Sequence, residues 1–176
     1  MKILVIDGPN INLLGVREVE VYGQESYQAL LDLLDQVQAE LEIDLIHFQS
    51  NHEGDLVDFI QANYQEADGI VINPAAYTHT SIALLDALKA VDLPTVEVHL
   101  SNLSKREDFR QVNYVRGFSI QSFENLGISG YRKAINYLRD YLEGQGWSHS
   151  LLITMILILT TYTSSLGRSP GKSPWW

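Results

Sequence analysis

Short apolar runs alternate with longer amphipathic segments along most of the chain. Such runs occupy residues 3–6, 45–48, 69–72 and 95–98, and a fifth run at residues 116–123 has a mixed pattern. Continuous apolar runs of roughly four to eight residues are typical of strands that a sheet buries on both faces. We therefore expect four buried β-strands and a weaker fifth strand.

The segments between these runs carry apolar residues at helical spacing. Patterns of this kind cover residues 26–41, 56–64, 82–91 and 128–142. In the first of them, Leu30, Leu34 and Val37 are three or four positions apart, so they share one face of a helix. Each pattern predicts an amphipathic helix that packs against the sheet.

Strands that alternate with helices predict parallel β-α-β units, and right-handed crossovers place the helices on both faces of the sheet. We expect an α/β fold with a doubly wound, five-stranded parallel sheet in the order 2-1-3-4-5. Ligands of such sheets bind beyond the carboxyl ends of the strands, at the switch point between strands one and three.

The end of the chain differs in composition from the rest. All three tryptophans lie beyond residue 146, no acidic residue does, and residues 164–174 are rich in Ser, Gly and Pro. The apolar run at residues 151–159 is far shorter than the roughly twenty residues that span a bilayer. We expect one domain at residues 1–146 and an atypical tail at residues 147–176. The tail is either a disordered or non-native extension or a docking segment for an oligomer or membrane surface.

Composition excludes several classes of chemistry and partner. The chain has no cysteine, which excludes disulfides and thiolate chemistry. Its formal net charge is −10. Such an acidic protein repels phosphate backbones, so we expect no nucleic-acid partner. The histidines at positions 47, 52, 79 and 99 lack the i,i+4 spacing of a metal site, so we expect no metal. No signal peptide precedes the first strand, so we expect a cytoplasmic protein and no membrane partner.

Polar clusters follow four of the predicted strands. They comprise Asn10, Asn12, Arg17 and Tyr22 after strand one; residues 51–53 after strand two; residues 73–81 after strand three; and residues 97–102, Arg106 and Arg110 after strand four. The connection after strand one, residues 7–23, is much longer than the roughly two to six residues usual in α/β units. The sheet topology gathers these clusters at one edge, where a site is expected.

Strand alternation points Glu97 and His99 to one face, and such a carboxylate can fix the tautomer of a histidine. Plainer interpretations also stand: a histidine in a strand can be structural, Thr80 or Ser81 can cap the third helix, and residues 51–53 can cap the second helix. Taken together, a tyrosine near an arginine, a histidine beside a glutamate and several amides suit proton abstraction and donation on a polyhydroxylated acid.

Several motifs resemble one enzyme family. They are GPNINLLG at residues 8–15 followed by Arg17 and Tyr22, QSNHEG at 49–54, NPAAYTHTS at 73–81, VEVHLSN at 96–102 and REDFR at 106–110. In this order they resemble type II 3-dehydroquinate dehydratase over about residues 1–143. The resemblance implies a flavodoxin-like fold, a homododecamer built as a tetramer of trimers, and loss of water from 3-dehydroquinate to give 3-dehydroshikimate without metal or organic cofactor.

The resemblance also implies a role for each matching residue. Tyr22 would be the base, with its phenolate favoured by Arg17, and Asn10 would stabilise the enolate oxygen through a water molecule. His99, held by Glu97, would protonate the departing hydroxyl. The implied substrate-binding residues are Asn73, His79 and Arg110 for hydroxyls, Leu100 and Ser101 for the carboxylate, and Asp86 in the site of a neighbouring subunit.

This sequence departs from the family pattern at several positions. Asp7 stands for a common asparagine, Val19 for a proline, Ala75 for a frequent glycine and Leu85 for a frequent arginine, and residues 111–114 also differ. Two other hypotheses remain at this stage. One is a non-catalytic flavodoxin-like binding module. The other is the same catalytic body with its assembly perturbed by the tail.

Overall fold

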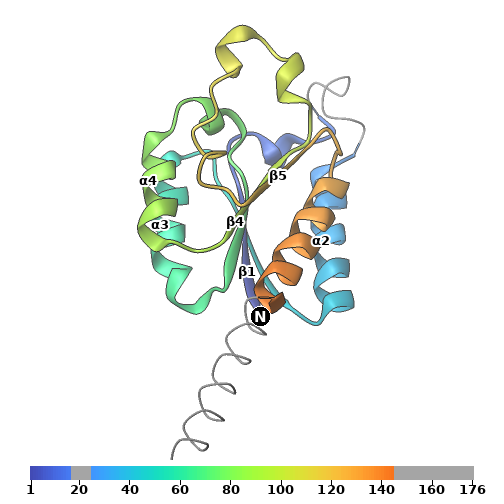
Figure 1. The fold of residues 1–176 in the computed structure, drawn as a ribbon. Helices are drawn as coiled ribbons and strands as arrows, with labels where there is room; N and C mark the ends of the chain where they lie inside the picture. Colours follow the sequence, from blue (N-terminus) through green and yellow to red (C-terminus); the bar gives the residue numbers. More distant parts are fainter. Residues whose placement is uncertain (17–24, 145–176) are drawn as a thin grey trace, which may run out of the picture. The chain divides into compact units, whose positions relative to one another are not determined.

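Five parallel strands form one sheet in the computed structural model, which describes residues 1–16 and 25–144 (Figure 1). The strands are β1 (Lys2–Asp7), β2 (Asp44–Gln49), β3 (Gly69–Asn73), β4 (Thr95–His99) and β5 (Gln121–Glu124). Their order is β2-β1-β3-β4-β5, and each neighbouring pair is parallel. The doubly wound sheet of order 2-1-3-4-5 is therefore confirmed.

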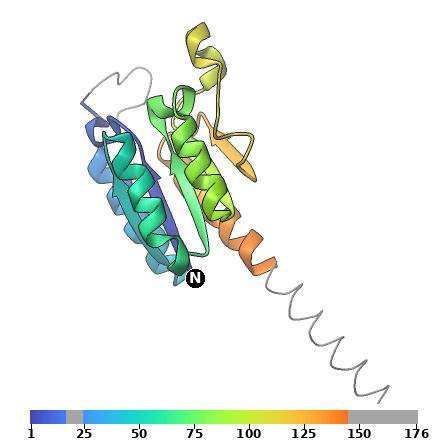
Figure 2. The same cartoon turned by 90° about the vertical axis from the view of Figure 1, so that its left-hand side faces the viewer.

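Helices cover both faces of this sheet. The helices α3 (Glu53–Asn63) and α4 (Ile82–Val91) lie on one face (Figure 1 and Figure 2). The other face is covered by α2 (Tyr27–Leu41) and by the helical residues 129–140. None of the helices in the described ranges is long and apolar enough to cross a membrane.

The core between the sheet and the pair α3 and α4 consists of fully buried aliphatic side chains. The sheet contributes Leu4, Ile6, Ile70 and Ile72, and the helices contribute Leu56, Ile60, Leu84 and Leu88. Ile3 and Val5 alternate to the opposite face of β1 and are equally buried. Burial on both faces explains why β1 and β3 have continuous apolar sequences.

Five short 3-10 turns connect the main elements within the described residues. They are η1 (Ile11–Leu13), η2 (Tyr64–Glu66), η3 (Ala75–His79), η4 (Leu103–Lys105) and η5 (Asp108–Arg110). Four of them follow the carboxyl ends of strands β1, β3 and β4, so they belong to the edge where a ligand site was expected. The turn η2 precedes β3, at the opposite edge.

The fifth strand begins at Gln121, so the expected start at residue 116 is wrong. The preceding residues form a turn in which the amides of Phe118 and Ser119 both donate to the carbonyl of Val115, at 3.0 and 3.1 Å. Local bonds of this kind keep these amides out of the sheet ladder. The sheet bonds begin when the amide of Ile120 donates to the carbonyl of Thr95 at 2.9 Å.

A close backbone contact joins the segments that leave β1 and β3. The amide of Gly8 donates to the carbonyl of Asn73 at 2.8 Å. A Cβ atom at Gly8 would lie 2.2 Å from the carbonyl oxygen of Pro74, so only glycine fits here. This contact brings the polar segments after the two strands together.

We expect Gly8→Ala to lower the free energy of unfolding by about 3 kcal/mol or more, because the new methyl group meets backbone that cannot rotate away. Gly54→Ala is the matched control, since its Cβ would meet no atom within 4 Å. In the first turn of α3 that change should stabilise the fold by about 0.5 kcal/mol. Urea denaturation measures both, and equal stabilities for the two variants would contradict the contact.

Candidate active site

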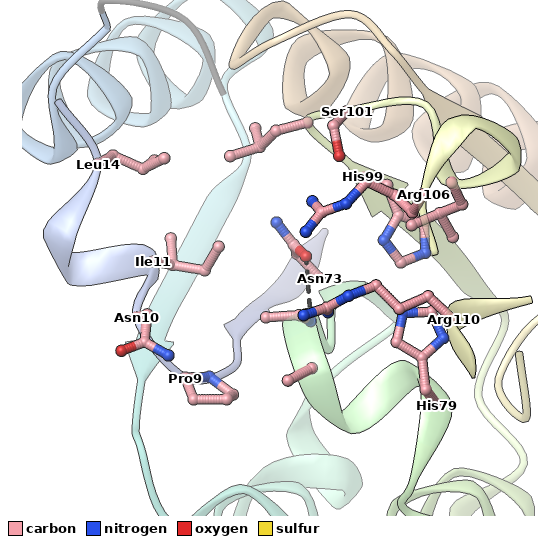
Figure 3. A pocket seen from close by; sticks show the side chains of 14 residues that line it. Pro9, Asn10, Ile11, Leu14, Asn73, His79, His99, Ser101, Arg106 and Arg110 are labelled. Atoms are coloured by element: carbon pink, nitrogen blue, oxygen red, sulfur yellow. Dashed lines mark hydrogen bonds between the residues drawn. The ribbon is translucent and has the colours of Figure 1, made fainter. Parts of the chain in front are cut away.

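A cavity of about 260 Å³ opens beyond the carboxyl ends of β1, β3 and β4 (Figure 3). The residues that line it are Pro9, Asn10, Ile11 and Leu14 after β1; Asn73, Ala75, Ala76 and His79 at and after β3; and His99, Leu100, Ser101, Leu103, Arg106 and Arg110 at and after β4. The cavity lies at the switch point between β1 and β3, where ligands of doubly wound sheets bind. Its volume suits a small polar metabolite.

The structure brings together most of the residues expected in the site. Asn10, Asn73, His79, His99, Leu100, Ser101 and Arg110 all line the cavity. Glu97 contacts His99 from behind, whereas Asp86 is exposed on α4 and does not line the cavity of its own chain. Arg17 and Tyr22 lie outside the described residues.

Two asparagines hold the loops at the β1 side of the cavity. Asn10 adopts a left-handed backbone conformation with φ of 68°, which asparagine tolerates better than most residues. Its backbone N–H donates a hydrogen bond to Oδ1 of Asn51 at 2.9 Å. The cluster after strand two therefore supports the loop after β1.

The capping hypotheses for the two helices have different outcomes. His52 occupies the N-cap position of α3 but its side chain makes no capping bond, and Asn51 bonds Asn10 instead, so the side-chain cap expected from residues 51–53 is wrong. Ser81 does cap α4, because its Oγ accepts a bond from the amide of Leu84 at 2.8 Å.

Asn73 ends β3 and is only 3% exposed. Its Oδ1 accepts a hydrogen bond from the amide of Ala75 at 3.2 Å, and its Nδ2 donates to the hydroxyl of Tyr131 at 2.9 Å. Ala75 itself has a φ of 52°, a region that glycine enters without steric cost. This conformation gives a physical reason for the glycine that the resembled family often has there.

His99 is held by a buried carboxylate. Its Nε2 lies 2.7 Å from Oε1 of Glu97, whose side chain is fully buried. An ionised carboxylate only accepts hydrogen bonds, so Nε2 carries a proton and Nδ1 is the ring atom left for a ligand. The shared face expected for Glu97 and His99 is confirmed.

Glu97 accepts bonds from three further side chains. Asn113 Nδ2 donates to Oε1 at 2.8 Å, and Ser122 Oγ and Arg116 Nε donate to Oε2 at 3.0 and 3.4 Å. Burial by itself raises the pKa of this carboxyl, but the hydrogen bond and charge of His99, with the bonds of Asn113 and Ser122, outweigh burial and hold the pKa below its ordinary value. Glu97 is therefore ionised at neutral pH.

His79 presents the opposite protonation pattern. Its Nδ1 lies 2.6 Å from the carbonyl oxygen of Val112, which only accepts, so Nδ1 is the donor. Burial lowers the pKa of His79, and the nearby charges of Arg110, His99 and Arg106 lower it further, against the bond to Val112, which raises it. The neutral ring then offers Nε2 as an acceptor for a ligand hydroxyl.

Arg106 lines the cavity although the sequence interpretation assigned it no role. Glu107 lies near both cavity arginines, 3.3 Å from Nε of Arg106 and 3.1 Å from Nε of Arg110. Two guanidinium groups favour an anionic ligand. The sequence feature that could have identified Arg106 is its position four residues before Arg110, which was expected in the site. The apolar lining of Ile11, Leu14 and Leu103 left no comparable signal in the sequence.

The lowered pKa of Glu97 links the site to acid stability. A carboxyl whose pKa is lower in the folded than in the unfolded state stabilises the fold above about pH 4.3, and this contribution is lost as the pH falls through the folded value. We therefore expect Glu97→Gln to be less stable than wild type near neutral pH, with the difference shrinking below about pH 4.3. Urea denaturation across pH measures it.

The matched control is Asp58→Asn, which removes an exposed carboxyl from α3. If the unfolding free energies of Glu97→Gln and wild type run parallel from neutral to acid pH, the stabilising ionisation of Glu97 is disproved.

Comparison with known proteins shows the family to which this chain belongs. The family model described as Dehydroquinase class II matches residues 1–139. The 3-dehydroquinate dehydratase of Clostridium perfringens strain 13 is 47% identical over 146 residues, covering 82% of this chain and 100% of that protein. The enzyme of the same name from Carboxydothermus hydrogenoformans is 50% identical over 143 residues, covering 81% and 93%.

A solved structure gives the same result for the fold. The crystal structure of type II dehydroquinase from Butyrivibrio crossotus matches with a TM-score of 0.77 and 44% identity, covering 79% of this chain and 97% of that one. The family and fold inferred from the motifs are thus confirmed. This chain belongs to the class II dehydroquinase family.

Proposed function

We propose that this chain converts 3-dehydroquinate to 3-dehydroshikimate by eliminating water. The observation that carries the proposal is the His99–Glu97 pair, which presents an imidazole to a cavity lined by amides and guanidinium groups in a chain of this family. A ketone with a hydroxyl on its β carbon needs a base for the α proton and an acid for the departing oxygen. The cavity supplies the acid.

The base is Tyr22, assigned from the sequence motif. An unperturbed phenol has a pKa of about 10, so a phenolate at neutral pH needs a nearby positive charge, which Arg17 supplies. The phenolate removes the proton from the carbon next to the ketone, and the electrons of that C–H bond form an enolate. Asn10 stabilises the enolate oxygen through a water molecule.

His99 completes the elimination. The enolate re-forms the ketone, the α,β carbon–carbon double bond appears, and the bond to the β hydroxyl breaks as His99 donates a proton from Nδ1, releasing water. Glu97 balances the positive charge of the imidazolium before this transfer. The proton gained by Tyr22 and the proton lost by His99 cancel, and exchange with solvent restores both groups.

The remaining residues bind and orient the substrate. His79 accepts a hydrogen bond from one hydroxyl through Nε2, and Asn73 and Arg110 bind the others. The carboxylate binds the backbone amides of Leu100 and Ser101 and the hydroxyl of Ser101. Asp86 acts in the site of a neighbouring copy.

Three broader expectations stay predictions. They are a homododecamer, a cytoplasmic location and a reaction that needs no added cofactor. We also propose that residues 1–146 form the catalytic domain and that the tail takes no part in the chemistry.

A direct assay tests the function. Adding 3-dehydroquinate should produce the ultraviolet absorbance of a conjugated enone. We expect Tyr22→Phe and His99→Gln each to lower kcat by about 10²- to 10⁴-fold, because each removes a proton-transfer group, while substrate binding is largely retained. Tyr64→Phe is the control, since it removes a hydroxyl from η2 at the opposite edge of the sheet.

Binding of 3-dehydroquinate without turnover in folded wild-type protein would favour the non-catalytic module instead. Turnover in Tyr22→Phe equal to that of wild type would rule out the proposed base.

The tail can be tested separately. We expect a chain without residues 147–176 to keep the wild-type kcat, because each proposed catalytic and binding residue lies before residue 111. Size-exclusion chromatography of both chains then reports whether the tail alters assembly. A loss of turnover on deletion would show that the tail belongs to the catalytic unit.

A further inference from the structure

A chain of buried polar groups runs from β1 to the floor of the cavity. Asp7, at the end of β1, is fully buried, and its Oδ2 lies 2.7 Å from Nε2 of His47. Its other oxygen, Oδ1, accepts a hydrogen bond from the hydroxyl of Tyr131, also fully buried. The same hydroxyl accepts a bond from Nδ2 of Asn73 at 2.9 Å. None of these contacts is used in the proposed chemistry.

The direction of each bond in this chain follows from the donors and acceptors available. The hydroxyl of Tyr131 donates its single proton to Oδ1 of Asp7. Burial, together with the charge of Asp7, raises the pKa of Tyr131 well above 10, so the hydroxyl keeps this proton at neutral pH. Its oxygen can then serve Asn73 only as an acceptor.

The orientation of the Asn73 side-chain amide is therefore fixed by a hydrogen bond at each of its two ends. Tyr131 requires the NH₂ group on its side, and the amide of Ala75 requires the carbonyl oxygen on the other. If the side-chain amide of Asn73 were flipped, its oxygen would face the acceptor oxygen of Tyr131. Its NH₂ group would face the donor N–H of Ala75. One N–H and one lone pair of Asn73 remain for a ligand, and the residue lines the cavity (Figure 3).

We propose that Tyr131 and Asp7 are positioning residues that lock the Asn73 amide in the one orientation that binds a substrate hydroxyl. This inference rests on the proposed function, because it gives Asn73 a substrate to bind. His47 holds the second oxygen of Asp7 and keeps the carboxylate turned toward Tyr131. The substrate-facing amide thus depends on residues that never touch the substrate.

A double-mutant cycle tests this coupling in the full chain with 3-dehydroquinate as substrate. Tyr131→Phe should lower kcat/KM by about tenfold to a hundredfold, since it frees the amide to rotate away from the productive geometry. In an Asn73→Ala background the same change should cost less than about twofold, because the group that it positions is already gone. A purely structural role predicts the same loss in both backgrounds.

Two further variants separate positioning from stability. Thr95→Val removes a buried hydroxyl that donates to the carbonyl of Leu93 at 2.9 Å, at the opposite end of β4, and should leave kcat/KM unchanged. Asp7→Asn keeps an acceptor for Tyr131 and should retain activity within about threefold, whereas Asp7→Ala should lose about as much as Tyr131→Phe. If Tyr131→Phe does not fold, the comparison of Asp7→Asn with Asp7→Ala tests the inference instead.

The outcomes separate the inference from the function on which it rests. Equal losses from Tyr131→Phe with and without Asn73, or no loss at all, overturn the inference and leave the function standing. If wild type binds 3-dehydroquinate without turnover, the function fails, and the same cycle measured as Kd by calorimetry decides the inference. A wild-type chain that neither binds nor turns over this substrate overturns both.

Discussion

Parallel pairing of the three central strands is the constraint on which the rest of the structure depends. β1 pairs with β3 so that Asp7 lies beside Asn73, and β3 pairs with β4 so that Ile72 lies beside Glu97. Parallel strands in this register end at the same edge of the sheet. The polar residues that follow them therefore surround one cavity although they are far apart along the chain.

Two buried carboxylates accompany this arrangement. Asp7 is the last residue of β1 and Glu97 is the central residue of β4, and both are fully buried. A buried charge is costly unless hydrogen bonds and opposite charges compensate it. Here Asp7 contacts His47 and Tyr131, whereas Glu97 contacts His99, Asn113, Ser122 and Arg116. In both cases the groups that compensate the charge also orient side chains around the cavity.

The departures from the family pattern have visible structural consequences. Asp7 accepts the hydrogen bond of Tyr131 through a carboxylate oxygen, whereas an asparagine at this position has one oxygen acceptor and an NH₂ donor. Asn113, in the divergent segment 111–114, shares Oε1 of Glu97 with His99. Ala75 keeps a left-handed conformation that a glycine would adopt more easily. The structure offers no explanation for Leu85. The first three departures therefore alter contacts at or beside the cavity.

The alternation of strands with helices predicted the sheet order, although β5 begins five residues later than expected. Local patterns in the sequence were enough to predict the first four strands, the helices and the pairing of Glu97 with His99. These features depend on periodicity and on bond geometry over a few residues, which sequence displays directly. The motifs added the family and most of the cavity residues. Packing decided the contacts between distant segments: Tyr131 meets Asp7 across 124 positions, and Arg106 reaches the cavity from a turn. No periodic signal records such contacts, because they depend on how a helix lies against the sheet and where a loop folds back.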